Sequence, residues 1–269
     1  MSISSSVFIG FLFAAAAEIA LPIVLLLVLG LKKKIAVIPM FLGFAAFFVS
    51  QLCLRLPLLQ VFSAQSWFKT FALNTIPYLI MLSVTAGLFE ESARYLCAGC
   101  FLKKHRSFND ALSFGLGHGF CEVILLTGMV QINNIIYTVM INNGSFSTAM
   151  AKVPSTASQQ ILTAMLAVKP ELIYLGILER VFAVTFHIFA SILIFKGVNE
   201  HKIHYYFLAL AAHAVFDFGY VALIKHTNIW VGEGFLLLTS LAALFFIFKM
   251  KPTFPTMNQI ETDTQTALL

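Results

Sequence analysis

Seven long apolar runs constrain this chain more than any other feature of its sequence. Each is close to or above the ~20 residues that a helix needs to cross a hydrocarbon layer of ~30 Å. Their hydrophobic residues are continuous, whereas membrane β-strands alternate in polarity over ~10 residues. The sequence therefore predicts an all-α, polytopic transmembrane helical bundle of about seven spans, at residues 5–31, 35–54, 75–102, 109–135, 171–195, 203–223 and 229–248.

Composition supports this fold class. The chain is 59% hydrophobic and only 11% charged, whereas soluble domains are about 25% charged. We expect residues 1–249 to form one integral membrane domain. Residues 250–269 form a polar tail that we expect to be disordered. Gly115, Gly117 and Gly119 predict a close approach of another helix, as small residues allow in membranes.

The net charge of +5 lies mainly beside the ends of the apolar runs. No basic tract is interleaved with aromatic residues, so we expect no nucleic-acid partner. Five Lys and Arg residues fall on one side of the expected bundle, and ten fall on the other: Lys32, Lys33, Lys34, Lys103, Lys104, Arg106, Lys196, Lys202, Lys249 and Lys251. The positive-inside rule then predicts a multi-pass protein of the cell membrane, with its N-terminus outside and its C-terminus in the cytoplasm.

The third run contains three charged residues within five positions, namely Glu90, Glu91 and Arg94. A charge at the centre of a bilayer costs at least ~2.5–3.5 kcal/mol, so such residues are paired or functional. In a helix, both carboxylates lie within reach of the guanidinium, because residues three and four apart are neighbours. We interpret this segment as the centre of an active site within the membrane.

Three other runs carry ionisable residues at helical spacing: His118 and Glu122; Glu179, Arg180 and His187; and His213 and Asp217. Taken one at a time, these residues have ordinary explanations as structural ion pairs or hydrogen-bonded core histidines. Together they predict one polar site shared by four helices, since an unpaired polar group in hydrocarbon costs several kcal/mol.

Carboxylates combined with histidines suit general acid–base activation of a water molecule. Arg94 can hold one of the two glutamates, Glu90 or Glu91, ionised, while the other accepts a proton from the water. We expect His187 and His213 to stabilise an oxyanion or complete the hydrogen bonds of the water. The same residue types could ligate zinc, with His118, His187 and His213 as the candidate ligands. The His-Glu-x-x-His signature of zinc proteases is not in the sequence, so we favour a site without a cofactor and keep zinc as the alternative.

Four motifs resemble the bacterial YhfC family, which is described as intramembrane proteases: Glu90-Glu91-x-x-Arg94, Gly117-His118-Gly-x-x-Glu122, Glu179-Arg180 followed by His187, and His213-x-x-x-Asp217. The resemblance covers essentially the whole chain and extends to the CAAX-prenyl endopeptidases, the CPBP proteins and the PrsW-type proteases. It implies that Glu90 is the catalytic glutamate, with Glu91 and Arg94 as its partners, and that Phe114-x-x-x-His118 is the second motif of that set. It also implies that His213 and Asp217 help to hold the oxyanion.

We therefore expect an intramembrane endopeptidase that hydrolyses a membrane-tethered peptide or protein through a glutamate-activated water, with a protease core at about residues 75–223. The expected catalytic set is Glu90, Glu91, Arg94, His118, Glu122, His187, His213 and Asp217, with Glu179 and Arg180 in support. A proton- or ion-coupled transporter, a haem protein with His187 and His213 as axial ligands, and a non-catalytic peptide-binding scaffold are the alternatives.

Overall fold

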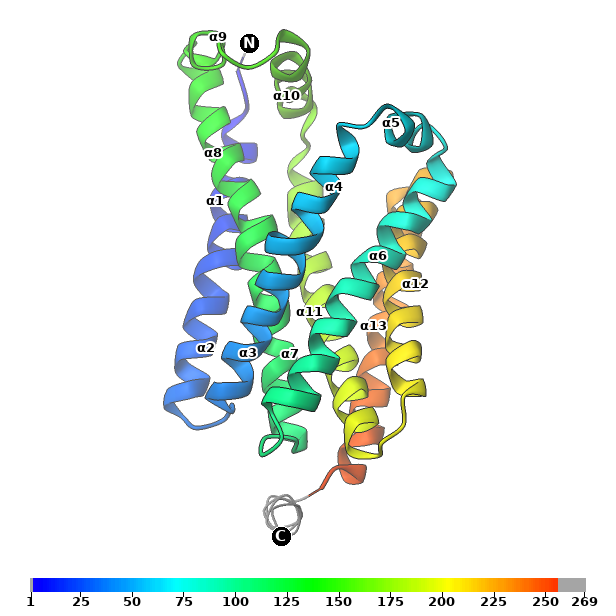
Figure 1. Ribbon diagram of the computed structural model, residues 1–269. Coiled ribbons are helices and arrows are strands. Elements are labelled where there is room, and N and C mark those ends of the chain that lie inside the picture. The colour runs from blue at the N-terminus through cyan, green and yellow to red at the C-terminus, as the bar shows by residue number, and fades with distance from the viewer. Residues whose placement is uncertain (1, 256–269) are drawn as a thin grey trace. The chain divides into compact units, whose positions relative to one another are not determined.

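The computed structural model describes residues 2–255, and all regular structure in that range is helical. The chain forms two compact units. The first unit contains the residues up to Val28 together with Glu122–Val181, and the second contains Leu29–Cys121 together with the residues from Phe182 onward. Figure 1 shows the helices in chain order.

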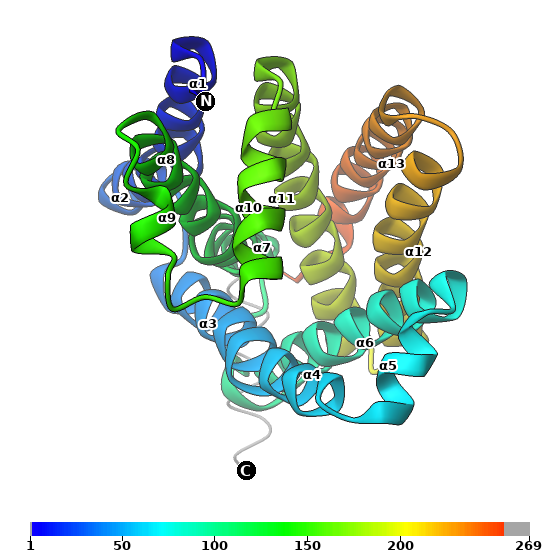
Figure 2. The same ribbon diagram turned by 90° about the horizontal axis from the view of Figure 1, so that it is seen from above.

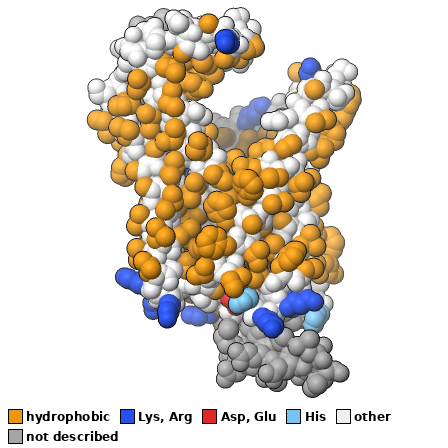
Figure 3. Space-filling view, turned by 60° about the vertical axis from the view of Figure 1, so that its left-hand side comes forward, with side chains coloured by type: hydrophobic (Ala, Val, Ile, Leu, Met, Phe, Trp, Pro, Cys, Tyr) orange, Lys and Arg blue, Asp and Glu red, His pale blue; other side chains and the backbone are white. Residues whose placement is uncertain are grey.

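Within residues 2–255, six helical stretches are long and apolar enough to cross a membrane: Ser5–Leu31, Val37–Ser63, Phe108–Asn142, Pro170–Asn199, His204–His226 and Ile229–Thr253. A bent pair, Ser66–Ala72 and Thr75–Phe101, turns by 107° and would make a seventh span. Many large apolar side chains on these helices face outward; Phe101 is 71% exposed and Phe248 is 69% exposed. Figure 3 shows hydrophobic side chains over much of the face that it draws. Soluble monomers rarely expose apolar surface on this scale, so the predicted multi-pass helical fold is confirmed.

The first unit is built from α1 (Ser5–Ala15), η1 (Ala16–Ala20), the start of α2 (Leu21–Leu31), η4 (Val123–Gly128), α8 (Met129–Asn142), α9 (Phe146–Ala149), α10 (Ser155–Ala167) and the first part of α11 (Pro170–Asn199). Helix α1 packs along α8. Their shared core includes Val7, Phe11 and Ile141.

The second unit is built from α3 (Val37–Phe47), η2 (Phe48–Arg55), α4 (Leu56–Ser63), α5 (Ser66–Ala72), α6 (Thr75–Leu96), η3 (Cys97–Phe101), α7 (Phe108–Glu122), the rest of α11, α12 (His204–His226), α13 (Ile229–Met250) and the short η5 (Lys251–Thr253). Helix α6 packs against α12 and the π-helical η2, and α12 packs against α13. Figure 2 shows α6 beside α12 from above. These helices bring the middle of α6 into the interior of the unit.

Glycines allow the backbones of α3, α7 and α11 to meet. A Cβ added at Gly117 of α7 would lie 1.9 Å from the backbone oxygen of Met40, and one added at Gly43 of α3 would lie 2.0 Å from that of Phe114. A Cβ at Gly115 would lie 2.6 Å from Cα of Ile188 in α11. The predicted close approach at the α7 glycines is therefore observed. It places the α7 histidine next to α6 and α11.

Pro22 and Pro57 each lie inside a helical span, shortly after a π-helical stretch. Proline lacks the N–H that would bond to the carbonyl four residues earlier, and a π-helix bonds one residue further back. Directly before Pro22, Leu21 N–H donates to Ala16 O; directly before Pro57, Leu56 N–H donates to Gln51 O. The second span therefore continues to Ser63, beyond the end near residue 54 that the sequence predicted, because Pro57 occupies the first turn of α4.

The expected tail, residues 250–269, is described only in its first part. Helix α13 ends at Met250, and Lys251–Thr253 form one 3₁₀ turn. The remainder of the tail, residues 256–269, lies outside the described residues.

Candidate functional site

Helix α6 supplies the three charged residues at the centre of the site. Glu90 is 4% exposed, and Glu91 and Arg94 are fully buried. Arg94 forms an ion pair with Glu91, three residues earlier, and another with Glu90 Oε2, four residues earlier, at 3.3 Å. Both carboxylates reach one guanidinium, as the spacing predicted. A buried charge needs such partners, because an uncompensated one is strongly destabilising.

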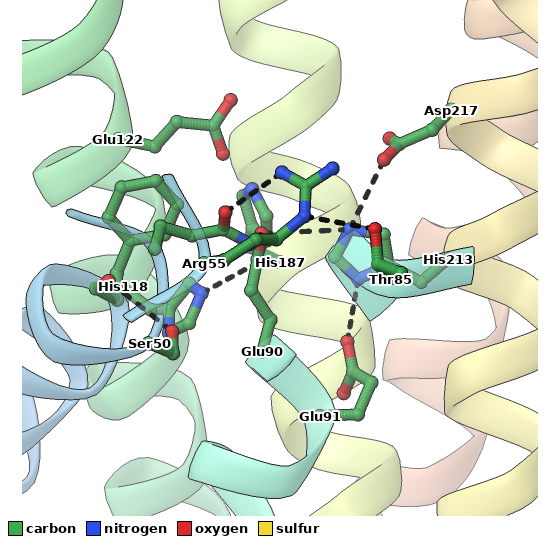
Figure 4. Close-up of polar contacts among 12 residues, drawn as sticks. Ser50, Arg55, Thr85, Glu90, Glu91, His118, Glu122, His187, His213 and Asp217 are labelled. Atoms are coloured by element: carbon green, nitrogen blue, oxygen red, sulfur yellow. Dashed lines mark hydrogen bonds and ion pairs between the residues drawn. The ribbon is translucent and has the colours of Figure 1, made fainter. Parts of the chain in front are cut away.

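The Oε2 atom of Glu90 faces two histidines from neighbouring helices (Figure 4). His118 of α7 places Nε2 at 2.9 Å from this oxygen, and His187 of α11 places Nδ1 at 3.8 Å. The two imidazole rings are adjacent, with their centroids 5.1 Å apart. Because an ionised carboxylate only accepts hydrogen bonds, His118 carries its proton on Nε2 when it is neutral.

The Oε1 atom of Glu90 faces a different pair of residues. Gln51 of η2 donates from Nε2 to this oxygen at 2.7 Å. His213 of α12 places its own Nε2 at 3.8 Å from it. The Glu90 carboxylate therefore lies within ion-pair or hydrogen-bond distance of five side chains, from Gln51, Arg94, His118, His187 and His213.

Glu91 and Arg94 connect the remaining histidines. His213 Nδ1 lies 2.8 Å from Glu91 Oε1, and its Nε2 lies 3.6 Å from Asp217 Oδ2. Arg94 Nη2 lies 2.7 Å from His187 Nδ1. Arginine can only donate, so His187 Nδ1 is the acceptor, and the neutral ring carries its proton on Nε2. The orientations of both rings are thus fixed by charged neighbours.

Glu90, His118 and His187 form a group that could hold a metal ion. All three are buried, and one donor atom from each lies within 4.8 Å of the others. A glutamate with two histidines is a ligand set found in catalytic zinc sites. In the part of the chain that the structure describes, His118 Nδ1 has no hydrogen-bond partner. The donor types and their spacing fit zinc. The group differs from the three histidines expected from the sequence, because Glu90 takes the place of His213.

Three residues of the expected site belong to the first unit. There Arg180 donates to Glu122 Oε1 at 3.4 Å and to Glu179 Oε2 at 3.3 Å. Glu90, Glu91, Arg94, His118, His187, His213 and Asp217 all belong to the second unit. The structure thus brings seven of the ten expected residues together in one compact unit.

Sequence reasoning missed Gln51 and Arg55 as parts of the site. They are four apart in an apolar run, the same signal that identified His118 and Glu122. Because this run was predicted to end near residue 54, Gln51 and Arg55 were expected at the edge of the membrane and not in its interior.

Comparison with known proteins assigns the family. Residues 17–236 match the family described as YhfC intramembrane metalloprotease. The chain belongs to the YhfC family. A protein of Bacillus subtilis (strain 168), named Uncharacterized membrane protein YhfC, is 30% identical over 188 residues, which make up 66% of this chain and 70% of the relative. No solved structure matches the chain. The resemblance to the YhfC family that the motifs indicated is confirmed.

The matched region contains Glu90 and the five residues whose side chains lie around its carboxylate. The YhfC family description names a membrane location, proteolysis and a metal. It agrees with the membrane helices of the structure. It favours hydrolysis over the transport, haem and scaffold alternatives.

Proposed function

We propose that this YhfC-family protein is an intramembrane endopeptidase whose hydrolytic centre is Glu90 with His118 and His187. The observation that carries the proposal is the Glu90 carboxylate, which is buried on α6 and is surrounded by three histidines and an arginine. Carboxylates and imidazoles so arranged can accept, hold and return the protons of a hydrolysis.

In the proposed reaction, the carboxylate of Glu90 accepts a proton from water as the water oxygen adds to the carbonyl carbon of a peptide bond. His213, held by Glu91 at 2.8 Å, lies on the Oε1 side, where it can donate to the oxyanion that forms. The C–N bond then breaks, and the proton held at the Glu90–His118 pair passes to the leaving amine. Arg94 contacts Glu90, Glu91 and His187 and holds these side chains in place during the proton transfers.

Glu90, His118 and His187 would hold a zinc ion. The chemistry that such an ion supplies when bound is polarisation of the peptide carbonyl and a more acidic water. The ligand set and the description of the YhfC family support zinc. Hydrolysis depends on Glu90 in either case, as the base without the ion and as a ligand with it.

We further propose the orientation predicted from the charges, with the C-terminus in the cytoplasm, and a membrane-tethered peptide or protein as substrate. The proposed protease core, residues 75–223, gains the η2 segment, because Gln51 contacts Glu90.

The test compares membrane-protein termini in cells that produce the wild-type chain or Glu90→Gln. Glutamine keeps the volume of the side chain and removes the charge and the basic oxygen. We expect a new peptide terminus within a membrane segment in wild-type cells only. Glu18→Gln is the matched control, because Glu18 is also a buried glutamate within a span, bonded to Gln131. Equal termini in wild-type and Glu90→Gln cells would overturn the proposal.

A further inference from the structure

The π-helical segment η2 presents two polar side chains to α6. Gln51 is 3% exposed, and its Nε2 donates to Glu90 Oε1 at 2.7 Å. On the other side of the same amide, Gln51 Oε1 accepts from Arg55 Nη1 at 3.0 Å. The amide thus lies between an arginine and the glutamate at the centre of the site. π-Helical turns occur frequently at functional sites.

These contacts fix which way the amide faces. Arginine has only donors and an ionised carboxylate has only acceptors. If the amide were turned over, its NH₂ group would face the guanidinium and its oxygen would face Glu90, and both contacts would be repulsive. Only one orientation satisfies both neighbours, so Gln51 always presents a donor to Glu90.

Arg55 is itself held on α6, the helix that carries Glu90. Its Nη2 donates to Leu82 O at 2.6 Å, and its Nε donates to Thr85 Oγ1 at 3.2 Å. The Thr85 hydroxyl donates in turn to Met81 O at 2.8 Å. The chain of hydrogen bonds from Glu90 through Gln51 to Arg55 therefore begins and ends on α6. The backbone of this helix fixes the distance between its two ends.

We propose that Gln51 is a positioning residue for Glu90 and that Arg55 sets the orientation of Gln51. By holding Oε1, the amide keeps Oε2 directed at His118 and His187. This inference rests on the proposed function for its effect on turnover. The contact with Glu90 is separately measurable. A partner of this kind orients a carboxylate ligand or base, and its loss typically reduces activity 10–100-fold.

The test uses Gln51→Met, which keeps the length of the side chain and removes both the donor and the acceptor. With one membrane-spanning peptide that the wild-type protein cleaves, we expect kcat to fall about 10–100-fold while KM stays within about twofold. Ser50→Ala is the matched control: Ser50 is buried in the same segment, and its hydroxyl donates to the backbone at Phe47 O. Thermal unfolding of both variants identifies any loss caused by misfolding. An unchanged kcat in folded Gln51→Met would overturn the inference.

A second measurement does not depend on activity. The carboxylate stretching band of Glu90 is the infrared band that disappears in Glu90→Gln. We expect this band to shift in Gln51→Met and to stay in place in Ser50→Ala. A band at the same position in wild type and Gln51→Met would overturn the inference even if cleavage were observed. If the wild-type protein cleaved nothing, the proposed function would fail, and the band would still decide the contact.

Discussion

Glu90 offers two oxygens with different surroundings. Oε2 faces His118 and His187, the other members of the group that fits zinc, whereas Oε1 faces Gln51 and His213. One carboxylate can thus act toward a metal or a water on one side while it is held in place on the other. The different roles that we propose for Glu90 and Glu91 rest on the same contacts, because Glu91 bonds to Arg94 and His213.

The group formed by Glu90, His118 and His187 predicts that the histidines of the site differ in their effect on zinc binding. His118→Gln and His187→Gln are each expected to weaken zinc binding by at least the 10–100-fold that even outer-shell changes cost. His213→Gln is expected to retain zinc, because His213 lies outside the group. Metal analysis of purified protein, titrated with a chelator, measures this. Zinc lost equally from all three variants would contradict the assignment of ligands.

At the scale of helices, Gly43 of α3 and Gly117 of α7 let these two helices pack closely beside His118. Gly43→Ala and Gly117→Ala would each place a methyl group about 2 Å from a backbone oxygen of the facing helix. We expect each to lower the free energy of unfolding by the ~1–3 kcal/mol typical of overpacking. Gly99→Ala is the control, since a Cβ there meets nothing within 4 Å. Thermal unfolding in detergent compares them, and equal stability of all three variants would refute the close packing.

The turn between α11 and α12 makes a prediction about pH. Hydrogen bonds from Lys196 and Lys202 lower the pKa of Glu200 to about 2. An unfolded glutamate has a pKa of about 4.3, so the contribution of Glu200 to stability is present above that pH and is lost as the pH falls toward 2. Glu200→Gln is therefore expected to lower the unfolding temperature at pH 7 and to have no effect near pH 2. Glu171→Gln is the control, because Glu171 forms no ion pair within the described residues. A loss in Glu200→Gln that is the same at both pH values would contradict the ion pairs.

Much at the element level was predictable, because long apolar runs have few solutions in a membrane. The six apolar stretches, the further one in the bent pair, and the pairing of Glu90 and Glu91 with Arg94 follow from length and helical spacing. The continuation of the second span past Pro57 was not predictable, because it depends on a π-helical stretch whose bonds bypass the missing N–H. Because the span was predicted to end too early, the sequence did not identify Gln51 as part of the site.

At the scale of the whole molecule, the sequence predicted one site from ten residues, and these residues are divided between the two compact units. Spacing along one helix identifies neighbours, as for His213 and Asp217. It does not tell which helices form one compact unit. Glu122 follows His118 by one turn, yet Arg180 binds Glu122 in the first unit, whereas His118 binds Glu90 in the second. Those pairings depend on packing that spacing alone does not define.

The orientation of the chain in the membrane is a prediction from its lysines and arginines. In a variant without the four native cysteines, a membrane-impermeant thiol reagent is expected to label Lys69→Cys in intact cells. It is expected to label Lys104→Cys only after the cells are permeabilised, because the positive-inside rule places that residue in the cytoplasm. The reverse pattern would invert the topology, and labelling of both in intact cells would contradict it.

The central claim is that hydrolysis depends on Glu90. The most direct measurement reconstitutes the wild-type chain, Glu90→Gln and Glu18→Gln in vesicles with membrane proteins from cells that lack the chain. Mass spectrometry then counts new peptide termini. We expect equal cleavage by wild type and Glu18→Gln, and a rate about 10²–10⁴-fold lower for Glu90→Gln, as loss of a general base typically causes. Cleavage by Glu90→Gln at the wild-type rate would contradict the account.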